Sequence, residues 1–249
     1  MVPLSGSRFL VADDEHGVRL VMKKGGQAVA TLILDAAGNE RVSGLEGMCR
    51  VGDRVLAVRE ADGALTSFVV PAVLPAVVPA VLPAVVPAVV PAAGASIGLA
   101  KEVGFLPRPP TSQGKPNKGW EGIAFLPASL AFDQRDHLVA VHEGKPRLVG
   151  VFSWPSLSPE RHIDIGPPLD ALLADLSDVA VHPRTGELWI LSDESEAVAR
   201  VQLTKAGLTF VAAHTVPVGD GEKPEGIAFD EAGALWLVTD NSSRLLRLE

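Results

Sequence analysis

The sequence predicts an all-β protein in which residues 1–249 form a single five-bladed β-propeller. Four segments repeat one plan: an acidic residue precedes a short apolar run, a turn leads to a second apolar run, and a second acid follows. The runs are too short for most helices, and the 3.6-residue periodicity of amphipathic helices is scarce. Small antiparallel sheets repeated around an axis form a propeller.

Each repeat supplies two strands joined by a turn, and Gly and Asp in the turns suit hairpin loops. The paired runs lie at 44–48 and 54–60, 119–125 and 137–143, 176–181 and 187–193, and 224–229 and 234–240. Third strands are expected at 65–69, 148–152, 198–203 and 245–248. A flat β-sandwich is the alternative, but it would not explain why an acid recurs at the same place in each repeat.

A fifth, partial unit opens the chain, with strands expected at 8–12, 18–22 and 28–34 and no evident inner strand. The last repeat ends after its third strand. We therefore expect incomplete first and last blades, with a ring that closes imperfectly or by exchange between the termini. The only brief helical pattern covers residues 169–175.

A low-complexity insert of Pro, Ala and Val occupies residues 71–93, with proline at every fourth position from Pro71 to Pro91. So long an apolar run usually indicates a membrane span. Here each proline removes a helical hydrogen bond at a cost of about 3 kcal/mol, and proline is also excluded from central strands. We interpret the segment as an extended insertion between blade strands; contact with a membrane or a partner is the alternative, and no other part of the chain predicts membrane contact.

Charge and cysteine content exclude several classes of protein. The net charge is −8 and the 22 Lys and Arg residues are scattered, which argues against nucleic-acid binding. The lone Cys49 excludes an internal disulfide and a Cys-rich zinc site, and its apolar neighbours indicate a buried, inert thiol. Residues 1–7 carry no signal-peptide pattern, so the cytoplasm is the default location.

The acids of the repeats are the candidate functional residues. Those that open the inner strands should converge at one mouth of the channel: Glu46, Glu121, Asp178 and Glu225. Converging carboxylates repel one another unless a cation or hydrogen bonds compensate, and calcium suits such a set of oxygen ligands. The acids that end the second strands predict a second layer or a second metal site: Asp14, Glu60, Glu143, Asp193 and Asp240. The alternative is structural, since an acid at a strand corner can accept backbone N–H groups.

Other candidates for the channel mouth are His142, beside Glu143, and Trp120, beside Glu121. The equivalent apolar contexts of Trp120, Trp189 and Trp236 favour packing between blades. No His pair has metal-ligand spacing, and no Gly-x-Ser-x-Gly nucleophile elbow is present.

Three stretches carry a resemblance to a known family: NKGWEGIA at 117–124, LSDVAVHPRTG at 176–186 with LSDES at 191–195, and PEGIA at 224–228. Together they resemble the SdiA-regulated family, with some similarity to phytase-type esterase propellers and NHL-repeat propellers. The resemblance implies a five-bladed propeller, a bound calcium ion and a site at the propeller centre. It also implies a bacterial protein of a kind often exported or membrane-anchored, so the periplasm or envelope is the alternative location.

Three functions remain open. The first is a calcium-binding propeller that binds an unidentified small molecule or protein. The second is a metal-dependent hydrolase of esters or phosphoesters, with Glu121 or Glu225 as the base. The third is a structural scaffold, because fold alone does not decide function.

Overall fold

The computed structural model describes residues 1–4, 8–13, 17–24, 27–35, 43–70, 101–109, 119–219, 221–240 and 244–248. Blade 1 consists of β1 (Val2–Leu4), β2 (Arg8–Asp13), β3 (Gly17–Lys24) and β4 (Gln27–Asp35). Blade 2 consists of β5 (Leu45–Val51), β6 (Arg54–Arg59), β7 (Ala64–Val69) and β8 (Lys101–Phe105). Blade 3 consists of β9 (Gly122–Leu126), β10 (His137–His142), β11 (Leu148–Ser153) and β12 (Pro159–Asp164). Blade 4 consists of β13 (Asp178–Val181), β14 (Leu188–Ser192), β15 (Ala197–Thr204) and β16 (Gly207–Thr215). Blade 5 consists of β17 (Pro224–Phe229), β18 (Leu235–Thr239) and β19 (Leu245–Leu248).

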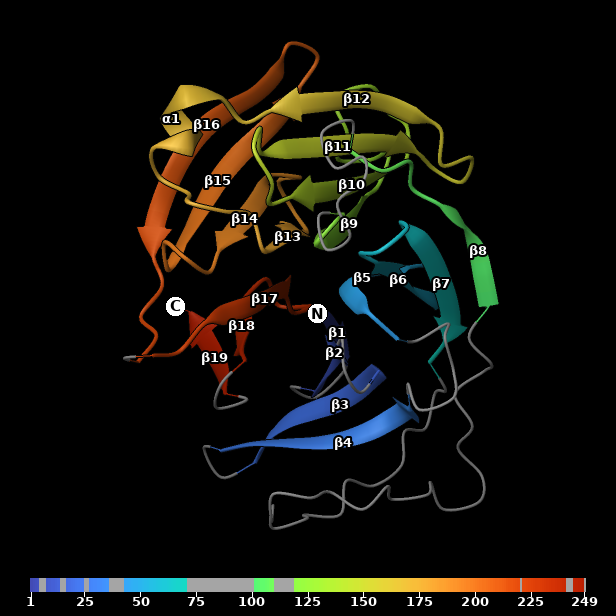
Figure 1. Cartoon of the computed structure of the whole chain (residues 1–249), viewed down its shortest axis with the longest axis vertical. Helices are drawn as coiled ribbons and strands as arrows, with labels where there is room; N and C mark the ends of the chain where they lie inside the picture. Colours follow the sequence, from blue (N-terminus) through green and yellow to red (C-terminus); the bar gives the residue numbers. More distant parts are fainter. Residues whose placement is uncertain are drawn as a thin grey trace.

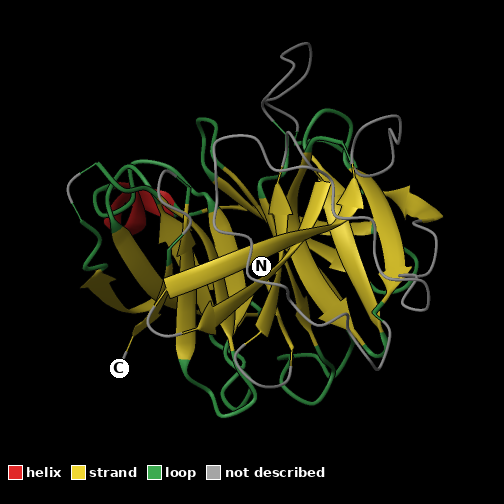
Figure 2. Ribbon diagram, turned by 90° about the horizontal axis from the view of Figure 1, so that it is seen from below, coloured by secondary structure: helices red, strands yellow, loops and turns green. Residues whose placement is uncertain are grey.

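The five antiparallel sheets stand around a common axis, with β1, β5, β9, β13 and β17 nearest the centre (Figure 1). Seen from the side, the strands run between two rims of loops (Figure 2). Within each sheet the strands follow one another in chain order, as hairpin connections require. The predicted five-bladed propeller is therefore confirmed.

The first blade differs from the prediction. It has its own inner strand, β1, which pairs with β2 through Val2 opposite Leu10. A strand of three residues that contains Pro3 gives almost no periodic signal, which is why the sequence did not reveal it. The last blade has three strands among the described residues, as predicted.

Five apolar clusters fill the five spaces between blades. The clusters join blades 1 and 2, blades 2 and 3, blades 3 and 4, and blades 4 and 5. The fifth joins blades 5 and 1, where the rings of Phe9 and Trp236 lie 5.1 Å apart. Within the described residues the ring thus closes by side-chain packing and not by strand exchange. The expectation of exchange between the termini is wrong because β1 already belongs to blade 1.

The glycines of the Glu-Gly pairs in blades 2 and 3 let the inner strands approach closely. A Cβ on Gly47 would lie 2.6 Å from the carbonyl oxygen of Glu121, and one on Gly122 would lie 2.6 Å from the Cα of Asp178. Cβ atoms are essentially never found so close to another heavy atom. At this level of the channel the backbones of neighbouring strands therefore contact each other without a side chain between them. The packing of the ring therefore requires the glycine of the Glu-Gly motif in blades 2 and 3.

Outside the sheets, the short helix α1 (Gly166–Asp170) begins with two prolines and ends before the helix expected at 169–175 would have ended. The low-complexity insert at 71–93 lies outside the described residues, between β7 and β8 of blade 2. No described helix is long and apolar enough to cross a membrane.

We expect Gly122→Ala to destabilise the protein by about 1–3 kcal/mol, because overpacking forces backbone shifts. Its matched control is Gly219→Ala, whose new methyl would meet side chains alone, the Arg244 guanidinium at 3.4 Å and Glu222 Cγ at 3.7 Å. The control should change the free energy of unfolding by less than about 0.5 kcal/mol. Urea denaturation measures both, and equal stability of the two variants would contradict the close approach of the inner strands.

Candidate functional site: a group of four glutamates at one mouth of the channel

Four glutamates of blades 2 and 3 gather where their inner strands begin. Glu46 lies on β5 and Glu121 directly precedes β9, while Glu60 and Glu143 directly follow the second strands β6 and β10. Backbone hydrogen bonds fix these corners: the N–H of Glu60 donates to the Gly44 carbonyl at 3.3 Å, and the N–H of Glu121 donates to the Val141 carbonyl at 3.0 Å. The first and second acids of neighbouring blades thus form one group, where the sequence predicted two layers. We call it the glutamate group.

Glu121 is at the centre of the electrostatics of this group. Burial raises the pKa of Glu121 to about 10, and the negative charges of Glu60, Glu46 and Glu143 and a hydrogen bond with Glu60 add to the effect. Its buried Oε1 has no hydrogen-bond partner among the described residues. Like charges in a poorly solvated site cannot all ionise. At neutral pH the group therefore needs a proton or a cation.

Asp178 was expected to join this group, and the strand register places it elsewhere. In blade 4 Asp178 pairs with Leu191, and in blade 3 Gly122 pairs with Val141 in the same way. The N–H of Ser177 donates to the Leu191 carbonyl at 3.0 Å. The N–H of Glu121 makes the equivalent bond to the Val141 carbonyl. Ser177 is thus the counterpart of Glu121, and Asp178 occupies the glycine position one residue further in.

The buried Asp178 carboxylate binds backbone across the ring. Its oxygens accept the N–H groups of Val179 at 2.8 Å and of Ile227, in blade 5, at 2.9 Å. It also forms an ion pair with the α-amino group of Met1 at 3.5 Å. Burial raises the pKa of Asp178, and these partners oppose the rise. The observed contacts are those of a group that joins blades 4 and 5.

Glu225 and Asp193 lie at the corner between blades 4 and 5. Lys223 Nζ donates to Asp193 Oδ2 at 3.1 Å, and the charges of Asp193 and then Glu225 raise the pKa of Lys223. Asp240 is exposed, and its backbone N–H donates to the Lys223 carbonyl at 3.0 Å. The charges that act most on Glu121 are those of Glu60, Glu46 and Glu143. A lysine therefore supplies the positive charge at this corner.

The sequence did not single out Asp175, which completes the corner. Burial and a hydrogen bond with Asp193 raise the pKa of Asp175 to about 7, although Ser192 also donates to it. A proton shared between two aspartates compensates for their repulsion. Only the triplet Leu-Ser-Asp repeated at 176–178 and 191–193 hinted at polar contacts here.

Trp120 and His142 pack behind the glutamate group and do not line the mouth. Trp120 is fully buried, and its Nε1 donates to the Pro107 carbonyl at 2.9 Å. His142 is buried with its Nδ1 at 2.7 Å from the Gly119 carbonyl oxygen, and the two rings lie 6.2 Å apart. Blade packing, the alternative that the sequence favoured for Trp120, agrees with these contacts.

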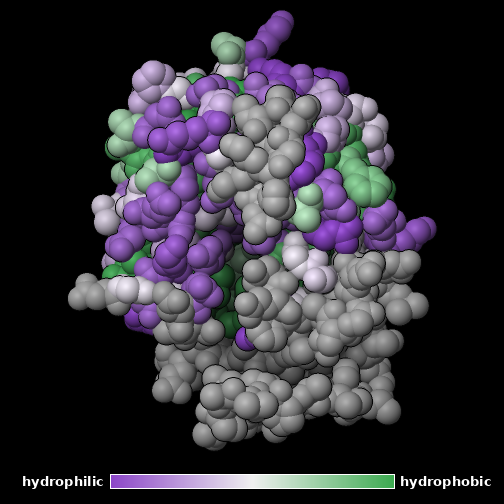
Figure 3. All heavy atoms as spheres, in the orientation of Figure 1, coloured by the Kyte–Doolittle hydropathy of each residue, from purple (hydrophilic) through white to green (hydrophobic). Residues whose placement is uncertain are grey.

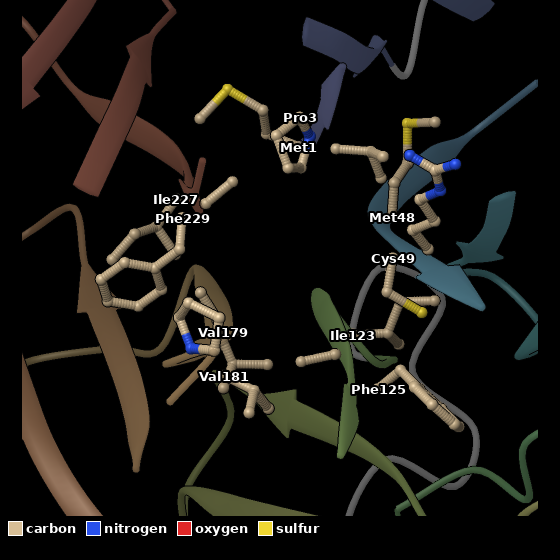
Figure 4. A pocket seen from close by; sticks show the side chains of 16 residues that line it. Met1, Pro3, Met48, Cys49, Ile123, Phe125, Val179, Val181, Ile227 and Phe229 are labelled. Carbon is tan, nitrogen blue, oxygen red and sulfur yellow. The ribbon is translucent and has the colours of Figure 1, made fainter. Parts of the chain in front are cut away.

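The channel beyond the acids is apolar. Figure 4 shows a cavity of about 140 Å³ at the axis, lined by residues of all five inner strands that include Ile123, Val179 and Ile227. In the space-filling view the described surface is largely hydrophilic, and hydrophobic atoms lie within the recess near the centre (Figure 3). Cys49 lines the cavity, and burial raises the pKa of its thiol well above the usual value. The inert cysteine predicted from the sequence agrees with this environment.

A second cluster of metal-ligand type, Asp133, His137 and Glu160, lies away from the axis in blade 3, with ligand atoms within 4.8 Å of one another. The guanidinium of Arg135 contacts Asp133 at 2.7 Å and Glu160 at 2.9 Å, so the cluster already contains a cation. Burial opposes the ionisation of Asp133, but hydrogen bonds from His137 and Arg135 lower its pKa to about 2. We assign these residues to an ion-pair network that holds the outer strands together.

Comparison with protein families identifies the chain. The profile of the SdiA-regulated family matches residues 110–243, more than half of the sequence, and this segment contains Glu121, Glu143 and the corner of blades 4 and 5. The chain belongs to the SdiA-regulated family. No curated protein matches it.

Solved structures share the propeller fold with this SdiA-regulated chain. Glutaminyl cyclase of Myxococcus xanthus is 13% identical over 100% of this chain and 93% of its own, with a TM-score of 0.51. A putative oxidoreductase (glucose dehydrogenase) of Thermus thermophilus is 15% identical over 100% of this chain and 95% of its own, with a TM-score of 0.52. A chain of the nidogen/laminin complex is 13% identical over 98% of this chain and 74% of its own, with a TM-score of 0.51. At these identities the likeness concerns the fold alone.

The raised pKa of Glu121 predicts how stability depends on pH. Folded Glu121 holds its proton up to a pH of about 10, whereas in the unfolded chain it loses the proton near pH 4.3. The folded state therefore binds more protons across this window, and stability falls as pH rises through it. Asp175 adds a smaller fall of the same sign that ends near its pKa of about 7.

We expect Glu121→Gln, in EDTA, to reduce this fall and to be more stable than the wild type at pH 8. Urea denaturation at several pH values measures the slope. The matched control Glu225→Gln, at the corner that contains Lys223, should keep the wild-type slope. If the free energy of unfolding has the same pH dependence in the wild type and in Glu121→Gln, the raised pKa does not belong to Glu121.

Proposed function

We propose that this SdiA-regulated propeller is a calcium-dependent binding module whose ion is held by the glutamate group. The observation that carries the proposal is the carboxyl of Glu121, which is half-buried among three other glutamates and has a pKa of about 10. A divalent cation would replace the proton and balance several of these charges at once.

The chemistry of the donor set fits calcium. Glu46, Glu60, Glu121 and Glu143 supply only carboxylate oxygens, and calcium takes six to eight oxygen ligands in flexible geometry. The unpartnered Oε1 of Glu121 is an acceptor that a cation would satisfy. When bound, calcium would supply positive charge at the mouth, where it could hold the oxygen atoms of a small molecule or a peptide.

A binding module agrees better with the site than a hydrolase does. A carboxyl whose pKa is about 10 is protonated at neutral pH and is not a base in the absence of a cation. Glu225, the other candidate base, lies beside Lys223 at a different corner of the ring. The two glutamates therefore do not form an acid–base pair on one substrate.

We expect calcium to raise the melting temperature and EDTA to reverse the rise. At a free calcium concentration 100 times Kd the gain is about 2.7 kcal/mol, which corresponds to about 5–10 °C for a domain of this size. Because Glu121 must lose its proton when the ion binds, the shift should grow between pH 6 and pH 9. Differential scanning calorimetry measures both effects.

The double variant Glu46→Gln/Glu121→Gln should fold and lose the calcium shift, whereas Glu225→Gln should keep it. If millimolar calcium does not raise the melting temperature of the wild type, the proposal is overturned. A shift that survives in the double variant but disappears in Glu225→Gln would also overturn it.

A further inference from the structure

Among the described residues, blade 5 has one strand fewer than blade 4, and a cleft lies beside its outer strand. Among the described residues β19 is the last strand of its sheet, while its neighbour in the ring ends with the long strand β16. A cleft of about 880 Å³ lies here, and its walls include His214 and Thr215 of β16, Leu235 of β18, and Arg247 and Leu248 of β19. This volume falls in the range of small-molecule sites, roughly 300–1,000 Å³. We call it the blade 4–5 cleft.

Flat aromatic rings form the inner wall of the cleft. The rings of His182 and His214 lie 6.5 and 5.9 Å from that of Trp189, at interplanar angles of 22° and 12°. Phe229 packs edge-on against both His182 and Trp189, with centroids at 4.9 and 5.2 Å. These rings pack on one another, and together they give this side of the cleft an aromatic lining.

Arg247 is the charged residue among the described residues that line the cleft, and none of these described residues is acidic. Arg200 lies 5.0 Å from the centroid of the Trp189 ring, and Arg184 approaches the lining residue Gly233. Two carboxylates lie near these arginines: Glu187 pairs with Arg200 at 2.9 Å, and Asp230 accepts the Trp236 Nε1–H at 2.8 Å and interacts with the charge of Arg247.

His182 adds a hydrogen-bond donor. Its Nδ1 accepts the backbone N–H of Thr185 at 3.2 Å, so the neutral ring carries its proton on Nε2. Burial and the charge of Arg184 lower the pKa of His182, which keeps the ring neutral at pH 7. Nε2–H is thus the donor that the neutral His182 ring can offer to a ligand.

We propose that the blade 4–5 cleft binds a small planar organic anion, an aromatic carboxylate, with its ring against the wall of Trp189 and Phe229 and its carboxylate toward Arg247. Shape, apolar lining and charge favour this occupant over a neutral or cationic one. The site is separate from the glutamate group: Glu46 and Glu121 stand where inner strands begin, whereas His182 and Phe229 stand where β13 and β17 end.

Isothermal titration calorimetry with 1-naphthoate, on the full chain in EDTA, tests the proposal independently of calcium. We expect saturable binding of one equivalent below millimolar concentration. The neutral isostere 1-naphthamide should bind at least about fivefold more weakly. Arg247→Gln should weaken naphthoate binding about tenfold, the effect expected for loss of one charge-assisted hydrogen bond.

Two further variants complete the test, each checked for folding by circular dichroism. Arg244→Gln, an exposed arginine that does not line the cleft, should bind naphthoate like the wild type. Ala232→Trp, on the exposed turn that lines the cleft, should fill its entrance and abolish binding. Absence of binding to the wild type, equal affinity for the amide, or wild-type affinity in both Arg247→Gln and Ala232→Trp would overturn the proposal.

Discussion

The structure depends on how closely the inner strands approach one another around the axis. At the level of Gly47 and Gly122 a single added carbon would lie 2.5–2.6 Å from the neighbouring blade. This contact joins blade 2 to blade 3 and blade 3 to blade 4, so it determines how these three sheets are spaced. In blade 4 the same position holds Asp178, whose carboxylate reaches blade 5 and accepts the Ile227 N–H at 2.9 Å. Backbone contact and a buried carboxylate are thus two means of joining adjacent blades.

The same constraint explains why charge gathers at one mouth. Because the steric limits at Gly47 and Gly122 leave no room for a side chain in blades 2 and 3, the residue before each glycine is the first that can carry one. In blades 2, 3 and 5 that residue is a glutamate, and in blade 4 it is Ser177. Glu121 therefore lies beside Glu46 and the acids that end β6 and β10, where burial and like charge raise its pKa to about 10. The corner of blades 4 and 5 differs because Lys223 and a protonated Asp175 compensate for the charge of Asp193.

The sequence predicted the features that repeat. The acids, glycines and apolar runs recur in register, so blade number, the inner strands of four blades and the burial of Cys49 followed from pattern alone. Two features escaped it. Strand β1 has only three residues, too few to show the alternation of buried and exposed side chains that marks a strand. Its pairing with β2 in the structure identifies it. The sequence pattern aligned Asp178 with the glutamates, but the structural counterpart of Glu121 is Ser177. Asp178 occupies the glycine position, where an acid looks like the repeated glutamate displaced by one residue. Likewise no sequence pattern joins Glu60 to Glu121, since that contact depends on how blade 2 packs against blade 3.

Anomalous X-ray diffraction from crystals soaked in terbium, which takes calcium sites through the same oxygen ligands, tests the central claim most directly. The account predicts one strong peak among the carboxylates of Glu46, Glu60, Glu121 and Glu143, at a position that the Glu121→Gln variant leaves vacant. A peak confined to Asp133 and Glu160 or to Asp193 and Glu225, or no peak at all, would contradict it.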